Sequence, residues 1–248
     1  DGARFDFRPL EAGAAHYHKT GTAFSDESMA ECRKADAILF GAVGLPHVRY
    51  PDGTEIATHV DLRAELDLYA GLHPIRSYPR LPRVLADKKA AAVDLVVVRE
   101  LSEGLLYSRG RGSLENDTVA RETMVISRDA SRRVSEFAFR VAGRRAKSKR
   151  RPGRVSCVDQ ANVLPSMAFF RRIFGEVAAA HPAISAEYAY VDATAAKLVR
   201  SPWDFDVLVT ESACGSVFSS LAAALAGSLS LAPTAEIGDR HAVFQPAH

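Results

Sequence analysis

Two kinds of hydrophobic pattern alternate along the chain. Short apolar runs such as residues 95–98, Leu-Val-Val-Val, are typical of a strand that is buried on both faces of a sheet. Elsewhere apolar residues recur every three or four positions, as they do from Val134 to Ala142, and this spacing predicts an amphipathic helix. Because strands alternate with helices, the pattern predicts an α/β fold built in layers.

The other elements follow from the same patterns and from turn residues. Ser25 precedes two acidic residues, which predicts the N-terminus of a helix. The basic segment 144–154 is expected to be a solvated connection that turns at Pro152 and Gly153, with a phosphate or nucleic-acid contact as the alternative. The remaining expected strands are residues 37–40, 155–158, 188–191 and 205–209, and the remaining expected helices are residues 62–70, 169–177 and 215–226.

The composition narrows the class of protein. Of the 248 residues, 47% are hydrophobic and 25% are charged, which is typical of a globular protein and excludes a disordered or fibrous one. Lys and Arg number 32 against 30 for Asp and Glu, so the net charge of +2 argues against nucleic acid as a partner. The apolar stretch 221–231 is too short and too interrupted to span a membrane. Three widely spaced cysteines fit a reducing, cytoplasmic location.

Several ordered motifs carry a resemblance to a known family. They read LRAELDLYAGLHP at 62–74, VRELSEG at 98–104, VDQANVL at 158–164, YVDA at 190–193, FDVLVT at 205–210, GSVFSS at 215–220 and FQPAH at 244–248. In order and spacing they resemble the motifs of the NAD-dependent, metal-dependent β-decarboxylating dehydrogenases, the family of isopropylmalate, isocitrate and tartrate dehydrogenases. The resemblance extends over essentially the whole chain.

The resemblance implies a fold and an assembly. It implies the two-domain isopropylmalate dehydrogenase-like fold, with a first, discontinuous domain of residues 1–70 and 226–248 and a second domain of residues 71–225 that contains the dimerisation region. The family's first strand and glycine-rich start are expected before Asp1, and its nucleotide-binding loop after His248. The family forms homodimers whose active sites borrow residues from the partner chain, so we expect a homodimer, or a hetero-oligomer with a family member.

The resemblance also implies which residues would bind substrate. Members of the family oxidise a 2-hydroxy acid, and arginines hold the substrate carboxylates because the guanidinium group matches a carboxylate in a two-pronged contact. Arg63 and Arg99 stand at two of these clamp positions. The third is His73, where the family has Arg, and a histidine cannot make the two-pronged contact.

The positions that carry the family's metal and proton chemistry differ more. A hard divalent cation needs several oxygen ligands, and carboxylates balance its charge. The family's pair of helix aspartates falls on Ser216 and Ser220, which leaves Asp192 as the remaining carboxylate. The family's lysine base falls on Gln160, a side chain without a titratable proton. The family's tyrosine position is Leu106, and the nearest phenol, Tyr107, comes one residue later.

These differences lead to three hypotheses about function, beside a fourth interpretation in which the chain is a truncated gene product. The first is a divergent family member that binds a small 2-hydroxy or 2-oxo carboxylate but has lost metal-dependent hydride transfer. The second is a metal-independent acid–base enzyme for dehydration or cyclisation, with His73, Tyr107, Asp192 and the nearby acid Glu211 as candidates. The third is an active NAD-dependent dehydrogenase of the tartrate or isopropylmalate type, with the family's NAD and Mg²⁺ or Mn²⁺ as cofactors and replacement ligands such as Glu211.

Overall fold

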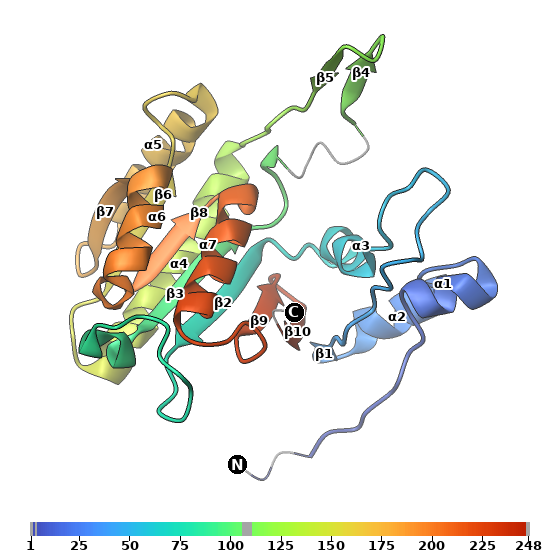
Figure 1. The fold of residues 1–248 in the computed structure, drawn as a ribbon, viewed down its shortest axis with the longest axis horizontal. Coiled ribbons are helices and arrows are strands. Elements are labelled where there is room, and N and C mark those ends of the chain that lie inside the picture. The colour runs from blue at the N-terminus through green and yellow to red at the C-terminus, as the bar shows by residue number, and fades with distance from the viewer. Residues whose placement is uncertain (1, 3, 106–110, 247–248) are drawn as a thin grey trace.

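The computed structural model describes residues 2, 4–105 and 111–246, and these form an α/β fold around one large sheet (Figure 1). Within the described residues this sheet has eight strands, in the order β1-β10-β9-β2-β3-β8-β6-β7. Their bounds are Ile38–Leu39 for β1, Ala70–Arg76 for β2, Asp94–Glu100 for β3, Arg154–Asp159 for β6, Ser185–Tyr190 for β7, Val207–Thr210 for β8, Pro233–Ile237 for β9 and Ala242–Pro246 for β10. The expectation of an α/β fold is confirmed.

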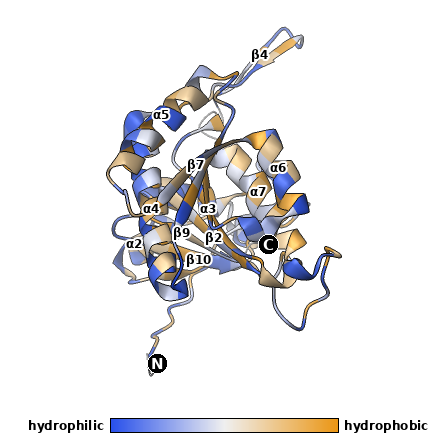
Figure 2. Cartoon of the chain, turned by 90° about the vertical axis from the view of Figure 1, so that its left-hand side faces the viewer, coloured by the Kyte–Doolittle hydropathy of each residue, from blue (hydrophilic) through white to orange (hydrophobic). Residues whose placement is uncertain are grey.

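Helices cover both faces of this sheet. Figure 2 shows α4 and α5 on one side of the strands and α6 and α7 on the other. The helices are α1 (Ala14–Thr20), α2 (Asp26–Lys34), α3 (Thr58–Glu65), α4 (Arg128–Lys149), α5 (Pro165–Ala179), α6 (Val191–Arg200) and α7 (Ser212–Leu225), with short 3-10 helices at Lys88–Ala92 and Pro202–Asp204. A small hairpin of β4 (Ser113–Glu115) and β5 (Val119–Arg121) stands apart from these layers (Figure 1).

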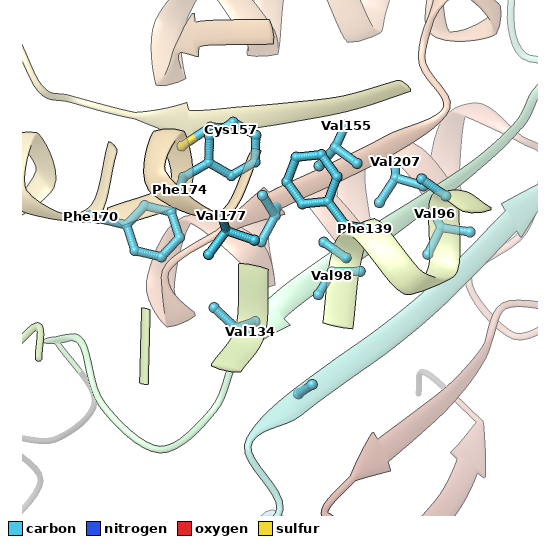
Figure 3. Close-up of a cluster of buried hydrophobic side chains, with 14 of the residues drawn as sticks. Val96, Val98, Val134, Phe139, Val155, Cys157, Phe170, Phe174, Val177 and Val207 are labelled. Carbon is cyan, nitrogen blue, oxygen red and sulfur yellow. The ribbon is translucent and has the colours of Figure 1, made fainter. Parts of the chain in front are cut away.

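The alternating side chains of β3 explain the layers. Val96 and Val98 point into the core beneath α4 and α5, where they join Phe139, Phe170 and Phe174 (Figure 3). Burial of these aromatic rings contributes strongly to stability, because each removes a large apolar area from water.

The intervening residues of β3 face the opposite way. Leu95 and Val97 lie in a second core with Leu198 of α6 and Phe218 of α7. The strand is therefore buried on both faces, as its β-branched run predicts.

The directions of the strands determine which of their residues lie next to each other across the sheet. Strands β3, β8, β6 and β7 run parallel to one another, whereas β2 is antiparallel to both of its neighbours, β3 and β9. The sheet is thus continuous between the parts of the chain that the resemblance assigns to different domains, since β2 pairs with β9. The division into residues 1–70 with 226–248 and residues 71–225 stays a prediction.

Two sequence predictions about local structure were wrong. The helix expected over residues 62–70 ends at Glu65, and Ala70 begins β2, because Tyr69 and Ala70 are drawn into the sheet by pairing with Ile237 of β9. Leu62 and Leu66 are nevertheless both buried. Tertiary pairing has overridden the local helical spacing here.

The basic segment 144–154 was also interpreted wrongly. Its first half continues α4 to Lys149, and only the residues after it form the predicted turn. Arg145 Nε donates a 2.8 Å hydrogen bond to the buried Asp206, and Lys149 pairs with Asp94. These contacts fasten α4 to the ends of β3 and β8, so part of the segment is structural rather than solvated.

Two smaller predictions were confirmed. The side chain of Ser25 accepts a 3.2 Å hydrogen bond from the backbone N–H of Ser28, which makes it the N-cap of α2. No helix in the described part of the chain combines the length and the apolar character needed to cross a bilayer.

Candidate substrate-binding site

The three residues expected to hold substrate carboxylates lie close together at one face of the sheet. His73 lies on β2 and Arg99 on β3, where Arg99 is paired in register with Gly71. Directly opposed residues, and residues two apart along a strand, point to the same face. Glycine at position 71 leaves room for them, because a Cβ atom there would lie 3.1 Å from His73 Nε2 and 3.4 Å from Arg99 Cβ. Arg63 approaches from α3, and its charge acts on both His73 and Arg99.

Arg63 already holds a carboxylate of this chain. Its Nε donates a 2.8 Å hydrogen bond to Glu236 Oε2, and its Nη2 donates to Glu236 Oε1, which together form a two-pronged ion pair. Both side chains are largely buried, at 13% and 5% exposure. Glu236 lies on β9 opposite Gly71, so its carboxylate belongs to the same face as His73 and Arg99.

Arg99 is the least satisfied charge of this group. Its residue exposure is 9%, its Nη2 lies 3.3 Å from the Ser212 hydroxyl, and its Nε has no hydrogen-bond partner among the described residues. Its aliphatic stem packs on α7, where a Cβ atom at Gly215 would come within 2.6 Å of Arg99 Cγ. Burial, and after it the charge of Arg63, lower the pKa of Arg99 to about 10. Arg99 is therefore a buried cation with unused hydrogen-bonding capacity.

His73 is held in its neutral form. Burial lowers the pKa of His73 to about 3, and the neighbouring charges of Arg99 and Arg63 act in the same direction. A neutral imidazole offers one donor and one acceptor rather than a charge. It therefore does not replace a third arginine as an anion clamp.

The neutral state of His73 predicts a pH dependence of stability. The unfolded chain takes up a proton at this residue below its ordinary pKa of 6.5, whereas the folded chain does not until about pH 3, so stability falls as the pH drops through this window. Replacing His73→Gln should remove this loss, and at about pH 5 the variant should retain about 2 kcal/mol more of its neutral-pH stability than the wild type. Urea unfolding at about pH 7 and pH 5 measures this difference.

The matched control is His18→Gln, at an exposed position near the end of α1. It should follow the wild type at both pH values. Equal acid-induced losses in the His73 variant and the wild type would contradict a neutral His73.

The positions that the resemblance assigns to the family's metal ligands hold a donor set that does not fit a hard divalent cation. Ser216 and Ser220 lie one turn apart on α7, the first exposed and the second half-buried. Asp192 is exposed in the first turn of α6, and its Oδ1 accepts a 2.8 Å hydrogen bond from the backbone N–H of Ala193. No group of three or more His, Cys, Asp or Glu residues arranged to hold a metal occurs among the described residues. Hydroxyls supply too little negative charge for such an ion.

Glu211, which the sequence suggested as a replacement metal ligand, caps the N-terminus of α7 instead. It is the N-cap residue of α7, and its two carboxylate oxygens accept hydrogen bonds of 2.9 and 2.6 Å from the N–H groups of Ala213 and Cys214. A carboxylate at a helix N-terminus is stabilised by the unpaired N–H groups and by the helix dipole. Its oxygens are therefore engaged in the cap.

The remaining candidates are placed as follows. Gln160 directly follows β6 and is half-buried, and its backbone carbonyl accepts from the N–H groups of Val163 and Leu164. Tyr107, together with Leu106, lies outside the described residues. The structure thus places Arg63, His73 and Arg99 close together, while the roles assigned to them and to the other candidates stay predictions.

Comparison with known proteins identifies the family of this chain. Residues 1–248, the entire chain, match the family model of isocitrate/isopropylmalate dehydrogenases. The chain belongs to this family. It is 35% identical to the 3-isopropylmalate dehydrogenase of Aquifex aeolicus, over all of this chain and 68% of that protein. It is 37% identical to the 3-isopropylmalate/3-methylmalate dehydrogenase of Methanocaldococcus jannaschii, over 100% and 70% of the two chains.

Solved structures of the isocitrate/isopropylmalate dehydrogenase family share the fold. The isocitrate dehydrogenase of Methylococcus capsulatus superposes with a TM-score of 0.82 at 32% identity, over 96% of this chain and 67% of that one. A β-decarboxylating dehydrogenase of Thermococcus kodakarensis gives 0.73 at 33% identity, over 96% and 64%. The chain therefore spans about two thirds of the length of these family members.

The sequence did not indicate that Glu236, Ser212 and Gln245 would take part in this site. Glu236 stands on β9, a strand that the hydrophobic pattern did not predict, and its partner Arg63 is 173 residues away in the chain. The one signal was an acidic residue within a short run of small and apolar residues, Thr-Ala-Glu-Ile at 234–237, because a buried charge needs a partner.

A cavity and a cysteine outside the cluster of Arg63, His73 and Arg99 contribute nothing to its chemistry. A cavity of about 380 Å³ is lined by residues of α2, α3 and the preceding loops, none of which is a predicted site residue. Cys214 lies near the start of α7, and burial, and after it the charge of Glu211, raise the pKa of its thiol to about 12. A protonated thiol is a poor nucleophile.

Proposed function

We propose that this chain is a divergent member of the isocitrate/isopropylmalate dehydrogenase family that binds a small 2-hydroxy or 2-oxo carboxylate without metal-dependent hydride transfer. The observation that carries the proposal is that an anion-binding residue is present while the residues expected to bind a metal are replaced. Arg99 is a buried cation whose Nε has no hydrogen-bond partner in the part of the chain that the structure describes, whereas the positions on α7 that the resemblance assigns to metal ligands hold the hydroxyls of Ser216 and Ser220.

Binding of a carboxylate would complete the environment of Arg99. A buried guanidinium that lacks partners is destabilising, and a ligand carboxylate supplies charge-assisted hydrogen bonds to it. Neutral His73 beside it offers a hydrogen bond to the hydroxyl or oxo group that distinguishes a 2-substituted acid from a simple one. The two side chains together favour a small acid of this kind.

The same residues argue against acid–base catalysis in this site. A general base works best when its pKa lies near the working pH, and that of His73 is lowered to about 3. Glu211 is engaged as a helix cap, and Gln160 has no proton to exchange. We therefore favour binding over dehydration or cyclisation as the function of this cluster.

The family's NAD and Mg²⁺ or Mn²⁺ have no part in this proposal. A homodimer, or a hetero-oligomer with another family member, stays our expectation for the assembly. It is supported by the hairpin β4–β5, whose residues are exposed and include the apolar Leu114 and Val119, at 68% and 41% exposure. Exposed strand edges with apolar side chains pair readily with another chain.

The proposal is tested by three measurements on the unmodified chain: binding of small acids, binding of Mn²⁺ and formation of NADH. A panel of small 2-hydroxy and 2-oxo acids, assayed by thermal shift and calorimetry, should contain a ligand that adds about 2.7 kcal/mol of stability at one hundred times its dissociation constant. Mn²⁺ should show no affinity in the micromolar range, and no NADH should form from NAD and the same acids. Micromolar Mn²⁺ binding together with NADH formation would overturn the proposal, as would a panel without any ligand.

A further inference from the structure

The ion pair between Arg63 and Glu236 lies within the cluster rather than on the surface. Glu236 is 4% exposed, and Gln245 Nε2 donates a further 3.1 Å hydrogen bond to its Oε1. Its carboxylate thus receives hydrogen bonds from both prongs of Arg63 and from one amide. A carboxylate held in this way is shielded from water and strongly fixed.

This pair changes what the cluster can bind. With His73 neutral, one of the two arginine charges is balanced by Glu236 in a direct ion pair, while Arg99 has no such paired carboxylate among the described residues and feels Glu211 and Glu100 only through their charge. Arg63 uses its Nε and Nη2 to bind Glu236. Arg99, in contrast, has a buried Nε without a partner among the described residues. One carboxylate-binding guanidinium therefore remains.

We infer that Glu236 is an internal carboxylate which occupies Arg63 in place of a second ligand carboxylate, and so makes the site select 2-substituted monocarboxylates over dicarboxylates. The inference rests on the proposed function and names its ligand class. A ligand with a second carboxylate directed at Arg63 would have to displace Glu236. That displacement leaves a buried acid unpaired and brings two negative charges together, and both effects oppose binding.

A purely structural role for the pair predicts something different. In that case Arg63 and Glu236 only fasten α3 to β9, and their removal changes stability without changing the preference among ligands. Ligand preference is therefore the measurement that separates the two roles.

The probes are malate and 2-hydroxybutyrate, which share a four-carbon chain and a 2-hydroxyl group and differ in the distal carboxylate. Calorimetric dissociation constants for the unmodified chain should favour 2-hydroxybutyrate by about tenfold or more, given the usual worth of a charged hydrogen-bonded contact. This comparison needs no variant and does not depend on any variant's folding.

Substitution of Glu236→Gln keeps the shape of the side chain and removes its charge. It frees Arg63, so the affinity for malate should rise about tenfold or more while that for 2-hydroxybutyrate changes little. The matched control is Glu65→Gln, which removes a carboxylate from the half-exposed ion pair between Arg33 and Glu65 near the end of α3 and should leave both affinities unchanged.

A second variant removes the pair altogether. The double substitution Arg63→Met and Glu236→Met replaces two buried charges with apolar side chains, a change that folded proteins often tolerate. Affinity for 2-hydroxybutyrate should persist in it, because Arg99 holds the ligand carboxylate.

The outcomes separate this inference from the proposed function. Equal affinities for both acids in the unmodified chain, an unchanged preference in folded Glu236→Gln, or loss of 2-hydroxybutyrate binding in the double variant would each overturn the inference alone. Absence of binding of either acid to every protein, in a chain that also binds no other 2-hydroxy or 2-oxo acid, would overturn the proposed function and this inference with it.

Discussion

The triple substitution Gln160→Lys, Ser216→Asp and Ser220→Asp is expected to tighten Mn²⁺ binding by at least about 100-fold, because each carboxylate beside a doubly charged ion is worth several kcal/mol even at an effective dielectric constant of about 20. Positions 216 and 220 are one helical turn apart on α7, so the new carboxylates would project from the same side of the helix. Ser216 is exposed and Ser220 is half-buried, so neither substitution places a carboxylate in the fully buried core. Calorimetric titration with Mn²⁺ gives the affinity directly.

The control for this experiment carries Asn instead of Asp at both serine positions. Asn has the size of Asp without its charge, so this protein should bind Mn²⁺ as weakly as the natural chain. A similar gain in both proteins would show that side-chain size, not charge, limits the site. NADH formation by the triple variant alone would show in addition that the remaining substrate-binding residues are still in place, since a restored base contributes on the order of 10²–10⁴ in rate.

What could be predicted from the sequence was local in origin. The run of residues 95–98 contains only large apolar residues, so both faces of that strand had to be buried, and this fixed a sheet with helices on each side. The cap at Ser25 and the stripe from Val134 to Ala142 depend only on neighbours within a few residues. The motifs then placed Arg63, His73 and Arg99 at one site through the resemblance to the family.

What could not be predicted depends on partners far away in the chain. Tyr69 and Ala70 have helical spacing, yet their pairing with β9 decides that they are extended. Arg145 looked like part of a solvated basic run, but its partner Asp206 lies 61 residues further on. Glu236 is buried with its charge paired to Arg63 and its carboxylate hydrogen-bonded to Gln245, and Arg63 is 173 residues away in the chain. No local pattern records a charge whose partner comes from another element.

Substitution of Arg99→Met is expected to weaken carboxylate binding by about 100-fold, the loss of a charged, two-pronged contact. The same substitution should leave the free energy of unfolding unchanged or increase it. Met keeps the aliphatic stem that packs on Gly215 and removes a buried charge whose Nε has no partner among the described residues. Calorimetry with the best ligand and urea unfolding provide the two measurements.

The lowered pKa of Arg99 gives the sign of the stability effect. Folding lowers the pKa of Arg99 from its ordinary value to about 10, because burial disfavours the charged form. The protonated guanidinium therefore opposes folding at neutral pH, and this loss of stability is recovered only as the pH rises above about 10. Arg99→Lys serves as the comparison, since it retains a positive charge without the fork and should bind the ligand with intermediate affinity. A folded Arg99→Met protein that still binds the acid as tightly as the wild type would remove Arg99 from the site. A clear loss of stability in Arg99→Met would instead mean that the charge is satisfied within the fold and needs no ligand.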